Sequence, residues 1–107
     1  MKAFCLDVFH PPVHYEDRNS VVFKFGETLV NILLATEAPG LIGPAAVAGP
    51  QAGSRFQFTL AVDDVDECCA ELAERGVTLL NGPVDRPWGP RTASFCDPAG
   101  NIWEIAS

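Results

Sequence analysis

Glu104 stands alone as a carboxylate among apolar residues, in the segment Ile102-Trp103-Glu104-Ile105. This segment has strand character, and strand alternation puts Ile102 and Glu104 on one face and Trp103 and Ile105 on the other. We expect the bulkier pair in the core, which leaves Glu104 either in a cavity or in bulk solvent. In a cavity, its carboxylate can pair with a cationic ligand group or act as a general base.

Other motifs that carry chemistry are missing from the sequence. It contains no nucleophile–base pair, no phosphate-binding loop and no nucleotide fingerprint. The cysteines form no CxxC motif and no Cys/His pair with zinc-finger spacing; they are Cys5, Cys68, Cys69 and Cys96. We therefore expect small, buried, reduced thiols in a cytoplasmic protein. No signal peptide is recognisable in the N-terminal segment.

Composition excludes several partners. The 107 residues suit one domain or two very small ones, and no apolar run is long enough to span a membrane. Seven Lys and Arg against 14 Asp and Glu give a net charge of −7, so nucleic acid and anionic membranes would be repelled. A neutral or cationic small molecule suits this balance better.

The second half predicts a strand, a helix and three more strands. Asp64 and Glu67 match a capping box for a helix that ends near Arg75, and Gly76 is suited to its C-cap. Asn81-Gly82-Pro83 is expected to close the strand that follows the helix. The predicted strands cover residues 56–62, 77–80, 91–96 and 102–105, with a tight hairpin turn over 97–101.

The first half is a weaker copy that lacks the start of this pattern. Residues 3–9 are either the last turns of a helix or the leading strand itself. Strands are expected over 13–16, 21–25 and 28–34, and residues 38–54 have the Pro/Gly/Ala composition of a linker. The hairpin over 22–32 parallels residues 93–105, which puts Asn31 and Glu104 at corresponding positions on the same face of two related strands.

The quoted residues resemble the vicinal oxygen chelate superfamily, which includes glyoxalase I, extradiol dioxygenases and bleomycin-resistance proteins. The most specific match lies within 55–107: Val62-Asp63-Asp64-Val65-Asp66, Gly76-Val77, Pro87-Trp88-Gly89-x-Arg91 and Phe95-x-Asp97-Pro98-x-Gly100-Asn101-x-x-Glu104. The resemblance implies a single α+β domain of paired βαβββ modules, whose curled mixed sheets surround a cavity. Its first module (1–37) is truncated at the N-terminus, and its second (55–107) is complete.

The resemblance also implies where metal ligands would lie. The last-strand positions correspond to Asn31 and Glu104, and the first-strand position of the second module corresponds to Gln57. One carboxylate and two amides make a poor site for a divalent catalytic metal. We therefore expect no cofactor; if a metal binds, Glu104 and Gln57 would hold it. His14 could point inward from its strand, but it aligns with no ligand position.

Each candidate also has a structural alternative. Asn31 and Gln57 either orient a polar ligand or hydrogen-bond neighbouring strands and water. Trp88 either stacks on a ligand at a cavity edge or plugs a small core, and the plug is the commoner role. Arg91 is expected to form a surface ion pair with Asp85 or Asp97.

The leading hypothesis is a metal-independent protein that binds a neutral or cationic aromatic or drug-like molecule and has no catalytic residue. Its ligand-binding candidates are Glu104, Gln57, Asn31, Trp88 and His14. One alternative is a metal-dependent lyase or dioxygenase that uses Glu104, and another is a degenerate structural or interaction module. The missing strand would expose a sheet edge, so we expect a homodimer in which the partner covers this edge. Exchange of modules between the two chains is one way to form it.

Overall fold

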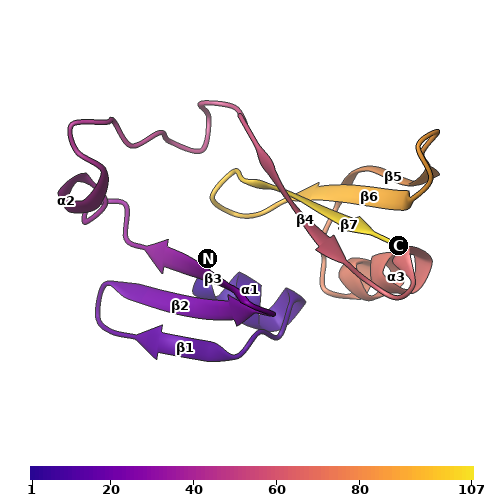
Figure 1. The fold of residues 1–107 in the computed structure, drawn as a ribbon, viewed down its shortest axis with the longest axis horizontal. Helices are drawn as coiled ribbons and strands as arrows, with labels where there is room; N and C mark the ends of the chain where they lie inside the picture. The colour runs from indigo at the N-terminus through magenta and orange to yellow at the C-terminus, as the bar shows by residue number, and fades with distance from the viewer. The chain divides into compact units, whose positions relative to one another are not determined.

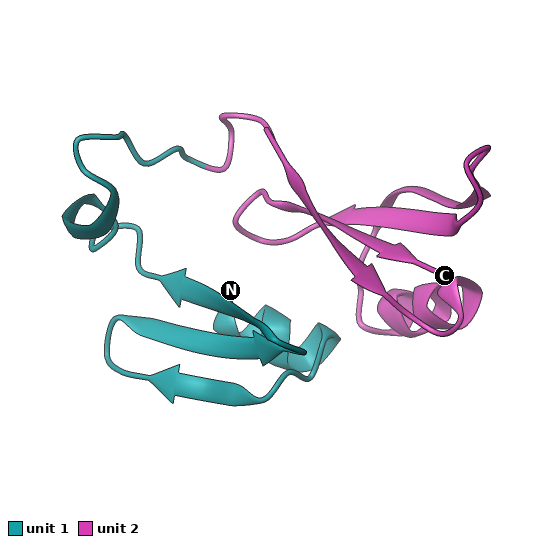
Figure 2. Cartoon of the chain, in the orientation of Figure 1, with its two compact units in different colours: residues 1–49 teal, residues 50–107 magenta.

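A computed structural model describes residues 1–107 and divides the chain into two compact units. Figure 2 shows unit 1, Met1–Gly49, and unit 2, Pro50–Ser107. Unit 1 contains α1 (Lys2–Val8), β1 (Val13–Glu16), β2 (Ser20–Phe25), β3 (Thr28–Leu33) and α2 (Pro39–Ile42). Unit 2 contains β4 (Gln57–Ala61), α3 (Val65–Glu74), β5 (Leu79–Asp85), β6 (Arg91–Cys96) and β7 (Ile102–Ala106) (Figure 1).

Unit 2 is a four-stranded mixed sheet with one helix packed on it. The strand order is β4-β7-β6-β5, in which β4 runs parallel to β7 and the other pairs are antiparallel. Arg91 of β6 bonds Asp66 of α3, so α3 covers the side toward which Arg91, Ala93 and Phe95 point. We call this side the helix face and the opposite side the open face.

The core of unit 2 lies between α3 and the helix face. Its buried apolar side chains are Val65, Leu72, Ala93, Phe95, Trp103 and Ile105. Each large one contributes about 1.5–3 kcal/mol by leaving water. The ring of Phe58 lies 4.8 Å from that of Trp103 and extends this core onto β4. The expected core pair, Trp103 and Ile105, is therefore confirmed.

Local sequence explains where α3 begins and ends. Asp64 is the N-cap, and its carboxylate accepts a bond of 3.1 Å from the Glu67 amide, as the capping motif predicts. After the helix, Gly76 adopts a φ of +79° and its N–H donates to Ala73, while the Val77 N–H donates to Leu72. This pair of bonds is a Schellman cap, in which glycine takes the left-handed position without strain.

Unit 1 is a smaller three-stranded antiparallel sheet, in the order β1-β2-β3. Its core contains Cys5 of α1 with Val21 and Phe23 of β2, and partly buried apolar residues pack around them; these are Met1, Phe4, Phe9, Phe25 and Ile32. Helix α1 ends before His10, whose φ is +53°, and Pro11. Proline disfavours helical geometry in the residue before it, which explains this end.

The expected α+β fold with two sheets is confirmed, and neither sheet closes on itself. The order α1-β1-β2-β3 in unit 1 matches α3-β5-β6-β7 in unit 2, so residues 3–8 lie in a helix, with Phe9 as its C-cap, rather than in a leading strand. The expected linker over 38–54 includes the short helix α2. The cavity between modules stays a prediction. No helix has the length and apolarity needed to cross a membrane.

One predicted strand end is wrong. Asn81-Gly82-Pro83 does not close a strand over 77–80; β5 begins at Leu79 and continues through these residues to Asp85. The pairing of β5 with β6 shifts register on either side of Asn81, and Gly82 has a φ of +85°. A glycine-centred bulge thus absorbs the turn-forming residues inside the strand.

Candidate functional site

Glu104 lies on the open face of unit 2, in the middle of β7. Thr59 of β4 and Ser94 of β6 flank it in register on either side. The Thr59 hydroxyl donates a hydrogen bond of 2.9 Å to Oε1 of Glu104. The carboxylate is partly buried, and its second oxygen, Oε2, receives no hydrogen bond from unit 2. It is therefore oriented by a neighbour and keeps acceptor capacity for another group.

Gln57 lies near Glu104 on the same face. It pairs with Ile102 at the start of β4, two residues before Thr59, so its side chain is a diagonal neighbour of Glu104. The side chain is exposed. An amide that combines donor and acceptor groups beside an oriented carboxylate is suited to fixing a polar ligand.

Arg86 and Trp88 occupy the loop between β5 and β6. Arg86 donates from Nε to the Thr92 hydroxyl at 2.8 Å and from Nη2 to Oδ1 of Asn81 at 3.0 Å. Its guanidinium carbon lies 5.8 Å from the ring centroid of Trp88. Trp88 is 72 % exposed, so it does not plug the core of its unit. The expected role as a core plug is therefore wrong.

Arg86 was not identified from sequence. Nothing in Arg86-Pro87-Trp88-Gly89-Pro90 separates this arginine from any other loop cation. Its position depends on strand parity: Thr92 points to the open face because Arg91 and Ala93 point to the helix face. The bulge in β5 that brings Asn81 beside it was not predicted either.

The other two candidates, Asn31 and His14, belong to unit 1. Asn31 pairs with Val22 at the middle of β3, on the side of the sheet opposite the α1-packed residues Val21 and Phe23. It therefore occupies in unit 1 the position that Glu104 occupies in unit 2. His14 is exposed at a register irregularity of β1. Both remain predicted ligand-binding residues.

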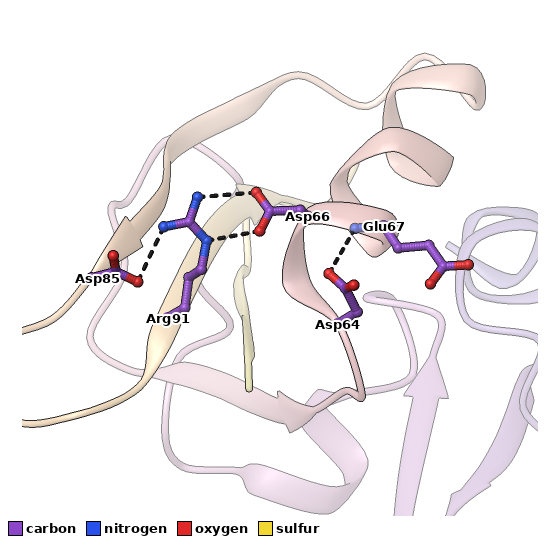
Figure 3. Close-up of polar contacts among 5 residues, drawn as sticks. All are labelled: Asp64, Asp66, Glu67, Asp85 and Arg91. Atoms are coloured by element: carbon purple, nitrogen blue, oxygen red, sulfur yellow. Dashed lines mark hydrogen bonds and ion pairs between the residues drawn. The ribbon is translucent and has the colours of Figure 1, made fainter.

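Arg91 forms a charged cluster on the helix face. Its Nε and Nη2 donate to the two carboxylate oxygens of Asp66 at 2.8 and 3.0 Å, and its Nη1 donates to Asp85 at 3.1 Å (Figure 3). These bonds lower the pKa of Asp66 and raise that of Arg91. The expected pairing with Asp85 is confirmed, whereas pairing with Asp97 is wrong. Asp66, which joins α3 to the hairpin, was not anticipated.

Asp97 is unavailable to Arg91 because it organises the β6–β7 turn. Its Oδ1 accepts the amides of Ala99 and Asn101, both at 2.9 Å, and its Oδ2 accepts Nε1 of Trp103 at 2.8 Å. Asp97 is buried, with 4 % exposure. The turn motif thus also fixes the large aromatic side chain next to Glu104 in sequence.

The donor groups around Glu104 do not fit a divalent catalytic metal. No three His, Cys, Asp or Glu side chains of the chain gather in an arrangement that could hold a metal ion. On the open face of unit 2, Glu104 offers a carboxylate, and its neighbours offer an amide and hydroxyls. Such neutral oxygens bind divalent metals weakly on their own.

The four cysteines are free thiols. Cys5 is buried, and burial raises the pKa values of the partly buried Cys68 and Cys69 on α3. Cys96 differs from the expectation of buried thiols because it is exposed at the end of β6. A raised pKa reduces the thiolate fraction, which disfavours redox and metal chemistry at α3.

Each unit combines a helix and a sheet in the same order, and this repeat defines the class of fold. Comparison of the chain with known proteins identifies its family. Residues 3–105 match the Glyoxalase/Bleomycin resistance protein/Dioxygenase superfamily, and the chain belongs to this superfamily. It is similar to the uncharacterized protein YraH of Bacillus subtilis, with 36% identity over 87 residues that cover 78% of this chain and 67% of YraH. The expected superfamily is therefore confirmed.

Solved structures show the same fold. A glyoxalase/bleomycin resistance protein/dioxygenase from Nocardioides has a TM-score of 0.82 at 19% identity, over 98% of this chain and 72% of that one. A lactoylglutathione lyase from Agrobacterium tumefaciens has a TM-score of 0.76 at 24% identity, over 98% and 80%. A superfamily member from Sphaerobacter thermophilus has a TM-score of 0.73 at 28% identity, over 98% and 85%.

Proposed function

We propose that this chain binds a small molecule without a metal, as a protein of the glyoxalase/bleomycin-resistance type. The ligand is neutral or cationic and contains an aromatic ring. The observation that carries this proposal is the Glu104 carboxylate, oriented by Thr59 on the open face and still able to accept a bond. A positioned carboxylate favours a cationic or hydrogen-bond-donating group. Gln57 and the exposed Trp88 ring supply further polar and aromatic contacts.

Benzylammonium tests this proposal because it joins a ring to a cation. Isothermal titration of the full chain should detect binding that weakens about tenfold or more in Glu104→Gln, since a charge-assisted bond is lost. Glu71→Gln is the matched control, because it removes the same charge from an exposed position on α3. Equal affinity in Glu104→Gln and the unaltered chain would refute the role of Glu104.

Elemental analysis separates the alternative functions. A metal-dependent lyase or dioxygenase would carry a near-stoichiometric divalent metal after purification without chelator or affinity metal, and Glu104→Gln would lose it. The donor set of unit 2 argues against this result. A degenerate structural module would contain no metal and would show no saturable binding of benzylammonium.

We also propose that the chain forms a homodimer in the cytoplasm. In unit 1, β3 pairs with β2 on one side and with no strand on the other, and Leu29 on this strand is exposed. A free edge favours pairing with another chain, and a second copy would cover it. The four free thiols favour a reducing compartment. A monomer at micromolar concentration in light scattering would contradict the dimer.

A further inference from the structure

Two arginines at the ends of the loop between β5 and β6 differ in the charge of their partners. Arg91 is neutralised by two carboxylates, Asp66 and Asp85. Arg86 is held by a hydroxyl, an amide oxygen and an indole ring, all of which are neutral. Arg86 is therefore a fixed cation without a carboxylate partner in a chain whose net charge is −7. It is available to an anionic group from outside the protein.

The geometry of Arg86 determines what kind of anion fits. Nε and Nη2 form one edge of the planar guanidinium, and this edge is bonded to Thr92 and Asn81. The opposite edge, formed by Nη1 and the second hydrogen of Nη2, makes no hydrogen bond to the protein. Two parallel N–H groups on one edge match the two oxygens of a carboxylate. Anchoring by Thr92, which is 1 % exposed, limits the conformational freedom that such binding would otherwise cost.

Arg86 and Glu104 belong to the same face of unit 2, Arg86 on the β5–β6 loop and Glu104 in the middle of β7. Arg86 bonds Thr92, and Glu104 pairs in register with Ser94, two residues farther along the same strand. Residues at this spacing in a strand are about 6.6 Å apart. Two side chains of opposite charge on one face favour a ligand that carries a group of opposite sign for each of them. The exposed ring of Trp88 lies beside Arg86 and offers a surface for stacking.

We propose that the open face of unit 2 binds an aromatic carboxylate that is neutral overall, with its carboxylate on the free edge of Arg86 and a cationic group at its other end facing Glu104. This inference rests on the proposed function and adds the anionic group that the ligand must carry. Arg86 is then a specificity-determining residue, because it rejects the neutral amide of the same shape.

Benzoate and benzamide provide the test, because they differ in charge and hardly in shape. The Arg86 Nε–H signal of the ¹⁵N-labelled full chain is followed by NMR at constant ionic strength, so that screening is equal in all titrations. We expect saturable binding of benzoate that is at least about tenfold tighter than that of benzamide, and about tenfold weaker in Arg86→Gln. Arg18→Gln removes the same charge from an exposed site in unit 1 and should leave benzoate affinity unchanged.

Two further measurements make the result decisive. The indole signal of Trp103, which is buried and bonded to Asp97, reports whether Arg86→Gln remains folded. Arg86→Lys keeps the charge without the planar edge and should recover only part of the benzoate affinity. Equal binding of benzoate and benzamide, no saturable benzoate shift, or unchanged affinity in a folded Arg86→Gln would each overturn the inference. Inorganic phosphate that binds as tightly as benzoate would overturn the carboxylate selectivity.

The outcomes for Glu104 and Arg86 are separable. If Glu104→Gln leaves benzylammonium binding unchanged while Arg86→Gln weakens benzoate binding about tenfold, the role of Glu104 in the proposed function fails and the carboxylate site stands. If Glu104→Gln weakens benzylammonium binding and Arg86→Gln does not affect benzoate, the proposed function stands and the carboxylate site is refuted.

Discussion

Each unit has a turn in which an aspartate carboxylate accepts backbone amides, and the two aspartates differ in burial. In unit 1, the Asp17 carboxylate accepts the amides of Asn19 and Ser20 at 2.8 Å in the exposed β1–β2 turn. In unit 2, the Asp97 carboxylate accepts two turn amides and the Trp103 indole, and it is buried. Water competes for exposed hydrogen bonds and not for buried ones, so the bonds of Asp97 contribute more to the free energy of unfolding than those of Asp17. In unit 2, the buried Asp97 bonds fix the start of β7, the strand that carries Glu104.

The last strands of the two units differ in chemistry as well. Asn31 and Glu104 hold corresponding positions on β3 and β7, but only Glu104 is charged and has a strand on both sides. The outer side of β3 pairs with no strand, so Asn31 lacks a counterpart of Thr59. An oriented carboxylate therefore requires the complete strand set of unit 2.

Substitution of the two turn aspartates should give the largest contrast. Asp97→Ala leaves the buried indole N–H of Trp103 and the partly buried amides of Ala99 and Asn101 without their acceptor, and we expect a loss of about 3 kcal/mol in unfolding free energy. Asp17→Ala should cost much less, because water replaces its bonds. Urea denaturation of both variants measures the difference, and similar midpoints would show that burial of Asp97 does not matter.

Two glycines provide the next comparison. Gly82 has a φ of +85°, and an added Cβ would collide with the Thr92 carbonyl oxygen. Gly82→Ala should therefore cost about 3 kcal/mol or more, from backbone strain and a collision between strands. Gly26, with a φ of +61° and open space around it, should cost about 1–2 kcal/mol as alanine, from strain alone. Thermal unfolding distinguishes them; a Gly82→Ala chain as stable as Gly26→Ala would contradict the close β5–β6 contact.

The bond between Thr59 and Glu104 should have a smaller effect, seen in binding rather than in stability. Thr59→Val removes the hydroxyl that orients the carboxylate and keeps the side-chain shape. We expect benzylammonium affinity to fall about fivefold, corresponding to one modest hydrogen bond. Thr28→Val changes an exposed threonine of β3 in unit 1 and is the matched control. Isothermal titration of the two variants gives the comparison; equal affinities would remove Thr59 from the site.

The smallest expected effect is the pH dependence of the Asp66–Arg91 pair. Hydrogen bonds from Arg91 hold the pKa of Asp66 below its ordinary value of 3.8, so the pair stabilises the fold above that pH. The contribution should disappear as pH falls through the lowered pKa. Unfolding free energies of the unaltered chain and Arg91→Gln should therefore converge at low pH, and a gap that persists or widens there would contradict the pairing.

Much of unit 2 could be predicted because its signals are local. The N-cap Asp64 and the left-handed Gly76 mark the ends of α3, and alternation over 102–105 assigns Trp103 and Ile105 to the core. The end of the following strand was wrong because turn-forming residues also form bulges, and only the β6 partner decides between them.

Prediction of the candidate site was limited by contacts between distant residues. Thr59 is 45 residues from Glu104, and Asp66 is 25 residues from Arg91, so no local pattern links either pair. Arg86 and Arg91 are similar as loop cations in sequence. Arg91 lies on the face that α3 covers and meets Asp66, whereas Arg86 bonds Thr92 on the open face. This difference follows from the alternation of side chains along β6.

A titration of the ¹⁵N-labelled full chain with 4-(aminomethyl)benzoate tests the central claim that the open face of unit 2 is the binding site. This molecule carries a cation and a carboxylate at opposite ends of one ring. We expect saturable shifts of the Thr59, Ser94 and Glu104 amides and of the Arg86 side chain, all with one dissociation constant. Shifts confined to α3 or to unit 1, with Arg86 and Glu104 unchanged, would contradict the account.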